Sequence, residues 1–151
     1  MTPHRWENEA EEAVIGVLLL TGEVNRVRDD FGLHPEHFYN EALGLVYRAM
    51  LEATSAGDHV DRLTVKSILH RLDADGKLPQ GQVWVEALAA CPPVSGNLQT
   101  YVRRVLEAAA WRDDYELLRR LNRAHRARDR RAWDEAMSGA ANVIPIRGRA
   151  A

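Results

Sequence analysis

Residues able to do chemistry occur in this chain, but none has the spacing that a catalytic site requires. A phosphate-binding loop needs a glycine-rich turn followed by Lys and Ser or Thr, so that backbone amides and the lysine reach the phosphates. The chain's one Gly-Lys pair, Gly76-Lys77, is followed by Leu78, and Arg71 stands where the first glycine would be. We therefore interpret Gly76 as the end of a helix and predict no nucleotide cofactor.

Metal ligands and nucleophiles are also scattered. His34 and His37 have no matching second pair, and Cys91 is the single cysteine, whereas a structural zinc site uses four such ligands. His70 and His125 lie beside arginines and are interpreted as solvated. No Gly-x-Ser-x-Gly sequence marks a hydrolase nucleophile. We predict no metal, no cofactor and no catalytic residue.

The strongest functional signal is a run of arginines in the last third of the chain. Guanidinium groups bind phosphate and carboxylate through two parallel hydrogen bonds, so a nucleic acid, an acidic protein and simple solvation all stay open. Any DNA contact should be weak and salt-dependent, because no nucleic-acid-binding motif accompanies the arginines. The candidate contact residues are Arg119, Arg120, Arg123, Arg126, Arg130 and Arg131, with Arg128 in the same run.

Charge is distributed unevenly although the net charge is only -2. Residues 1–90 carry 8 basic and 15 acidic side chains, and residues 91–151 carry 12 basic side chains, all Arg, and 7 acidic ones. An alternative source of the arginine excess is a GC-rich genome, whose codons favour Arg over Lys. The asymmetry itself favours pairing between copies, or a basic surface for an acidic partner. An acidic surface near Glu9, Glu11 and Glu12 is a candidate counterpart of the arginines.

Length and composition indicate one helical domain. A chain of 151 residues can bury a core without disulfides, and abundant Ala, Leu, Glu and Arg favour helices over strands. No apolar run approaches the roughly 20 residues of a membrane-spanning helix, and the first residues lack the basic start of a secretory signal. The single cysteine fits a reducing compartment. We expect a cytoplasmic protein without membrane contact.

Apolar periodicity predicts about five short helices in the first 90 residues. Val14 and Leu18 recur on one face of the first helix together with Ala10, Ala13 and Val17. Asn40 and Asp61 are residues typical of helix N-caps. The predicted helices cover residues 7–21, 23–30, 40–56, 61–76 and 82–90.

The clearest boundary is the proline-rich segment 91–96, which cannot continue a helix. Asn97 then caps a predicted helix that reaches Arg128, followed after a break near Asp129 by a second helix to Ala141. Trp133, Ala136 and Met137 are predicted to point inward between these two helices. The predicted organisation is a bundle over 1–91, a hairpin over 92–141 and a flexible tail over 142–151.

The long predicted helix carries apolar side chains that a small bundle cannot cover. About 32 residues span roughly 48 Å in a helix. Large apolar groups on such a helix are normally covered by another molecule. The candidate contacts with a partner or a second copy are Tyr101, Trp111, Tyr115 and Leu118.

Several blocks of the chain resemble the N-terminal domain of DnaB-type replicative helicases. The first helix has that domain's opening pattern of two glutamates, an apolar pair, a glycine and three leucine-like residues. An aromatic pair, Phe38-Tyr39, precedes a helix with an aliphatic-aromatic step, as in the second block of the family. The matching blocks cover residues 9–20, 38–50, 57–65 and 93–101, and the resemblance as a whole covers residues 3–128.

The resemblance implies an all-α fold, a compact multi-helix bundle followed by a helical hairpin. In this family the hairpins pair to form a collar on a hexameric helicase, and the domain contacts primase or a helicase loader. The ATP-driven motor of the family has no counterpart in this sequence. We therefore expect a non-enzymatic replication module that forms homo-oligomers or binds primase, helicase loader or helicase. Two alternatives are an N-terminal fragment of a full helicase and a small nucleic-acid-binding regulator that uses the arginine-rich hairpin.

Overall fold

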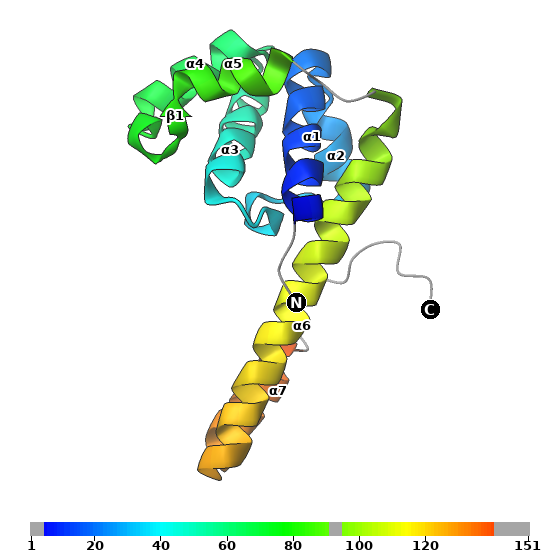
Figure 1. Ribbon diagram of the computed structural model, residues 1–151, viewed down its shortest axis with the longest axis vertical. Coiled ribbons are helices and arrows are strands. Elements are labelled where there is room, and N and C mark those ends of the chain that lie inside the picture. Colours follow the sequence, from blue (N-terminus) through cyan, green and yellow to red (C-terminus); the bar gives the residue numbers. More distant parts are fainter. Residues whose placement is uncertain (1–4, 91–94, 141–151) are drawn as a thin grey trace. The chain divides into compact units, whose positions relative to one another are not determined.

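The computed structural model describes residues 5–90 and 95–140, which form α-helices joined by short turns (Figure 1). The predicted all-α class is confirmed. The chain falls into two compact units, Met1–Leu106 and Glu107–Ala151. The predicted bundle–hairpin boundary at 91–92 and the predicted tail at 142–151 lie outside the described residues.

In its described residues, the first unit contains five α-helices and the start of a sixth, joined by one-turn 3-10 helices and a three-residue extended segment. The α-helices are α1 (Arg5–Thr21), α2 (Val24–Phe31), α3 (Glu41–Ser55), α4 (Arg62–Arg71), α5 (Gln82–Ala90) and α6 (Leu98–Ala127). The short elements are η1 (Pro35–His37), η2 (Asp75–Lys77), β1 (Pro79–Gly81) and η3 (Ser95–Asn97). With the exception of α4, each predicted helix boundary lies within about two residues of the observed one, the usual uncertainty of helix ends.

Helix α1 forms the interior of the bundle, where it packs against α3 and α5 (Figure 1). The predicted apolar face was too narrow, because Ile15 and Leu19 are buried together with Val14 and Leu18. A helix that is covered on several sides needs apolar residues around most of its circumference. Each fully buried aliphatic side chain contributes about 1.5–3 kcal/mol.

Helix α3 begins where the sequence predicted, at the cap residue Asn40. Its side-chain oxygen accepts hydrogen bonds from the backbone N–H groups of Ala42 and Leu43, at 3.0 and 3.4 Å. The buried Tyr47 hydroxyl donates to the carbonyl of Leu33 at 2.9 Å, and burial raises the pKa of Tyr47. These bonds fix α3 against the segment that precedes it.

The connection between η1 and α3 also depends on Gly44. A Cβ atom at this position would lie 3.0 Å from the backbone oxygen of Pro35, which is tighter than ordinary contact. Glycine therefore permits the close approach of the η1 turn to α3.

Helix α4 ends earlier than predicted, and Gly76 is not its stop. Asp73 adopts a left-handed φ of 53° directly after the cap residue Leu72. The N–H groups of Asp73 and Ala74 donate to the carbonyls of His70 and Leu69, at 3.0 and 2.9 Å. This is a Schellman ending, and Asp tolerates the left-handed region better than most residues. Leu72, directly after the last residue of the helix, is 47% exposed.

Helices α4 and α5 are joined by polar contacts around Glu86. Its carboxylate lies 2.7 Å from Lys66 Nζ and 3.3 Å from Arg62 Nη1. The hydrogen bond from Lys66 is the main reason why the pKa of Glu86 is lowered. Gln82 Nε2 adds a bond to the backbone oxygen of Lys66 at 3.1 Å.

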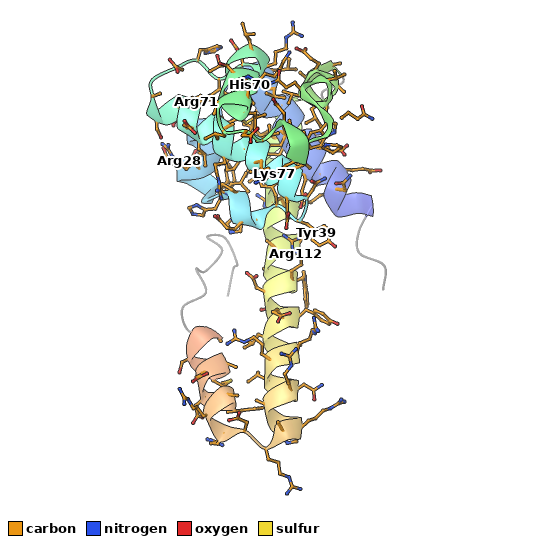
Figure 2. The ribbon with its side chains drawn as sticks, turned by 90° about the vertical axis from the view of Figure 1, so that its left-hand side faces the viewer. Arg28, Tyr39, His70, Arg71, Lys77 and Arg112 are labelled. Carbon is orange, nitrogen blue, oxygen red and sulfur yellow. The ribbon has the colours of Figure 1, made fainter. Side chains whose placement is uncertain are left out.

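The second unit is a helical hairpin in which α7 (Arg130–Ala140) lies alongside the last turns of α6 (Figures 1 and 2). Arg128 has a left-handed φ of 53°, and Asp129 caps α7 by accepting from the N–H of Ala132 at 3.0 Å. Ala136 is buried as predicted, but Met137 is 50% exposed and the prediction that it points inward is wrong. Consecutive helical residues point about 100° apart, so both cannot face α6 equally.

None of the helices in residues 5–90 and 95–140 combines the length and apolarity needed to cross a lipid bilayer.

Candidate interaction surfaces on the helical hairpin

Three large apolar side chains on α6 are exposed within the hairpin unit. Trp111, Tyr115 and Leu118 are 68%, 64% and 64% exposed. Their spacing of four and three residues places them on one face of the helix. By contrast, Leu121 is half-buried and Ala124 is buried. We call Trp111, Tyr115 and Leu118 the aromatic stripe.

Tyr101, the fourth predicted contact residue, does not join this stripe. It is half-buried and belongs to the first compact unit, whereas the stripe belongs to the second. The sequence identified three side chains that share one exposed face, and a fourth that does not.

Three of the predicted arginines form a second exposed line on α6. Arg119, Arg123 and Arg126 have the same four-and-three spacing as the aromatic stripe and are exposed. At 3.6 residues per turn they lie about 80°, 120° and 60° around the helix from Trp111. We call these three residues the arginine edge, which lies beside the aromatic stripe along α6.

The other predicted arginines differ in their partners. Arg130 pairs with Asp134 at 3.3 Å, and Arg131 pairs with Glu135 at 2.9 Å, both one turn apart on α7. Within the arginine edge, Arg119 lies 3.6 Å from Glu116. These pairs are exposed, and such pairs contribute little.

Four arginines of the run have no carboxylate partner among the described residues. Every residue between the start of the second unit and the end of α7 is described. The arginines without an ion pair there are Arg120, Arg123, Arg126 and Arg128.

The other chemical candidates do not assemble into a site. Lys77 is exposed at the end of the one-turn helix η2 (Figure 2), where no glycine-rich cradle surrounds it. His37 Nδ1 accepts from the backbone N–H of His34 at 2.9 Å, so the two histidines stabilise the η1 turn. Within residues 5–90 and 95–140, no group of three His, Cys, Asp or Glu side chains is arranged to hold a metal. Cys91 lies outside the described residues.

His70 has a partner that the sequence did not reveal. We predicted a solvated histidine, and His70 is indeed exposed at the end of α4 beside Arg71 (Figure 2). However, its Nδ1 lies 2.8 Å from Asp75 Oδ2, and this hydrogen bond raises the pKa of His70. The bonds from His70 and Gln82 lower the pKa of Asp75. The pair therefore connects the end of α4 with η2.

Glu11 is buried, although the sequence predicted it on the surface. We placed it on an acidic surface with Glu9 and Glu12, but it is only 1% exposed. Its two carboxylate oxygens accept backbone hydrogen bonds from Tyr39 at 2.6 Å and from Asn40 at 3.1 Å. That surface therefore cannot include Glu11. The run of glutamates in α1 gave no sign of this role, which only the distant 39–40 segment creates.

Comparisons with known proteins identify the family of the first unit. Residues 3–107 match the family described as the DnaB-like helicase N terminal domain. Replicative DNA helicase DnaB of Geobacillus stearothermophilus is 32% identical over 106 residues, which are 69% of this chain and 22% of that protein. The chain thus spans about a fifth of the length of this curated relative.

A solved structure extends the similarity. The N-terminal domain of DnaB helicase from Mycobacterium tuberculosis superposes with a TM-score of 0.78 at 26% identity, covering 88% of this chain and 95% of that chain. Residues 3–107 are only about 70% of the 151 residues, so a match over 88% extends into the hairpin.

Proposed function

The chain belongs to the family of DnaB-like helicase N-terminal domains, and on that basis we propose that it is a DNA-replication interaction module that binds other proteins and catalyses no reaction itself. The relative from Geobacillus stearothermophilus is a replicative DNA helicase, of which this chain spans 22%. The proposed contribution of this part is assembly, not movement along DNA. We propose the cytoplasm as the location of this role.

The aromatic stripe is the observation that carries the proposal. Three large apolar side chains on one helix face are costly to leave in water, and exposed apolar patches mark interaction surfaces. Trp and Tyr are also the residue types that most often dominate binding energy at protein interfaces. The stripe is therefore the proposed docking surface.

A second copy of the chain is the proposed occupant of the stripe. A two-fold contact would place the same apolar patch on both sides, so that each copy covers the other. The two segments of the chain also carry opposite net charge, which favours association between copies. Acidic groups exceed basic ones by seven in residues 1–90, and basic groups exceed acidic ones by five in residues 91–151. Primase, a helicase loader and a replicative helicase are the proposed further partners. The same role applies if the domain works within a longer helicase.

Sedimentation velocity tests the self-association. At tens of micromolar the protein should form at least a dimer, and Trp111→Asp combined with Tyr115→Asp should shift it to the monomer. Val83→Asp, a single change, is the control, because Val83 is an equally exposed apolar residue on a helix of the other unit. Circular dichroism should show unchanged helical content in both variants.

Two results would contradict the proposed surface. A wild-type monomer at these concentrations would exclude a second copy as the occupant. A dimer that survives the double Asp variant but not Val83→Asp would move the interface away from the hairpin.

A further inference from the structure

The closed end of the hairpin is strongly basic although the protein is not. Residues 119–131 contain seven arginines and one acidic residue, Asp129, while the whole chain has a net charge of -2. Asp129, whose carboxylate caps α7, offsets only one of these seven positive charges. An anion is therefore attracted to this segment by local charge and not by the charge of the whole protein.

The arginine edge is the part of this segment that offers a continuous contact line. Along α6, Arg119 and Arg123 are about 6 Å apart and Arg123 and Arg126 about 4.5 Å, measured as helical rise. All three side chains are exposed, and Arg123 and Arg126 have no ion pair among the described residues. On α7, by contrast, Arg130 and Arg131 already have carboxylate partners.

The composition of the segment distinguishes a nucleic acid from a protein partner. Protein interfaces are centred on buried apolar or aromatic anchors and are depleted of charge there. Leu118 is the last large apolar side chain of α6 that is exposed, and none is exposed between residues 119 and 131, a stretch that the structure describes in full. A nucleic-acid backbone needs no such anchor, because phosphates are bound by guanidinium groups alone.

We propose that the arginine edge, Arg119, Arg123 and Arg126, binds the phosphate backbone of nucleic acid without sequence preference. This goes beyond the proposed protein-binding role and uses the edge of α6 that lies beside the aromatic stripe. The carboxylates of Asp113 and Glu116 precede the edge on the same helix and repel phosphate, which limits the contact to about three phosphates. The binding is accordingly weak, in the range typical of non-specific contacts, and depends strongly on salt.

Fluorescence anisotropy with labelled oligothymidine of about 20 nucleotides tests the proposal, with a duplex of the same length and labelled poly-glutamate as further probes. Each phosphate contact in a single strand contributes about -0.7 to the slope of log affinity against log salt. Replacing all three residues by Gln should make the slope less steep by about 2. Gln is a good helix former, so α6 should be retained.

The matched control removes three exposed arginines from the first unit, Arg26, Arg48 and Arg71, again by Gln. It changes the net charge by the same amount, and these side chains are 52%, 59% and 65% exposed. The control variant should keep the wild-type slope. Two oligonucleotides of different sequence and equal length should bind the wild type equally.

Four results would overturn the proposal: no oligonucleotide binding at low salt, an unchanged slope in the Arg119, Arg123, Arg126 variant, an equal loss in the control variant, or equal binding of poly-glutamate. The last result would assign the edge to an acidic protein. Sedimentation of the same variants separates this proposal from self-association, since the edge variant should still form the dimer if the aromatic stripe is intact.

Discussion

Glu11 on α1 accepts a hydrogen bond from the backbone N–H of Tyr39 through Oε1, at 2.6 Å. Its second oxygen accepts from the N–H of Asn40 at 3.1 Å, and Asn40 is the residue that caps α3. Tyr39 is labelled in Figure 2, close to the start of α3. One buried carboxylate thus fixes where the third helix begins relative to the first, over a separation of 28 residues.

Replacing Glu11 by Ala should strongly destabilise the first unit. Two backbone donors lose their acceptor, and a buried unsatisfied donor costs about 1–3 kcal/mol. We expect the free energy of unfolding to fall by at least about 2 kcal/mol in urea titrations followed by circular dichroism. Glu12→Ala is the control, since Glu12 is half-exposed and accepts a hydrogen bond from Asn8 on its own helix. Equal effects of the two changes would refute a special role for Glu11.

Leu18→Ala should also reduce stability, for a different reason. Leu18 is fully buried in α1, and removing a buried Leu side chain costs about 2–5 kcal/mol through lost transfer energy and a cavity. Leu20→Ala, two residues further on the same helix, removes an exposed side chain and should change the melting temperature little. A similar melting temperature for the two variants would show that α1 is not the centre of the core.

Arg128→Gly should stabilise the hairpin. Arg128 has a φ of 53°, and the left-handed region costs a non-glycine residue about 1–2 kcal/mol. Glycine removes this strain but loses more conformational entropy on folding, so we expect a net gain of up to about 1 kcal/mol. Arg126→Gly, inside α6, should instead cost about 1 kcal/mol. Thermal unfolding of both variants checks the opposite signs, and destabilisation by Arg128→Gly would contradict the left-handed turn.

The stabilisation that the contact between His70 and Asp75 provides should be lost both at low pH and at high pH. The raised pKa of His70 means that its stabilisation is present below the ordinary value of 6.5 and is lost as pH rises through the raised value. The lowered pKa of Asp75 means that its stabilisation is present above 3.8 and is lost as pH falls through the lowered value. The contact is therefore fully formed between about pH 4 and 6.5.

An NMR titration of the His70 ring measures this contact directly. Asp75→Asn should bring the pKa of His70 down towards its ordinary value, because the hydrogen bond with Asp75 is the largest cause of the shift. Asp73→Asn should have a smaller effect, since Asp73 acts only through charge and is the weakest cause. If Asp73→Asn lowered the pKa as much as Asp75→Asn, the observed geometry would be wrong.

Local signals in the sequence predicted most of the helices. Caps such as Asn40 and Asp61 act within three residues, so the segment itself contains the information about where α3 and α4 begin. The end of α4 was missed because Asp73, and not a glycine, adopts the left-handed conformation. The resemblance of the opening helix to DnaB-type helicases also required no structure, and the match of residues 3–107 confirmed the family.

The sequence by itself determined the helical class, the family and the candidate residues of both hairpin surfaces, because periodicity, capping and sequence blocks are local properties of the chain. Only the tertiary structure decided which of these residues are covered. Glu11 resembles its exposed neighbours in sequence and is buried by a segment 28 residues away, while Met137 follows the buried Ala136 and is exposed. Burial depends on what packs against a residue from elsewhere in the chain, and a single element contains no information about that.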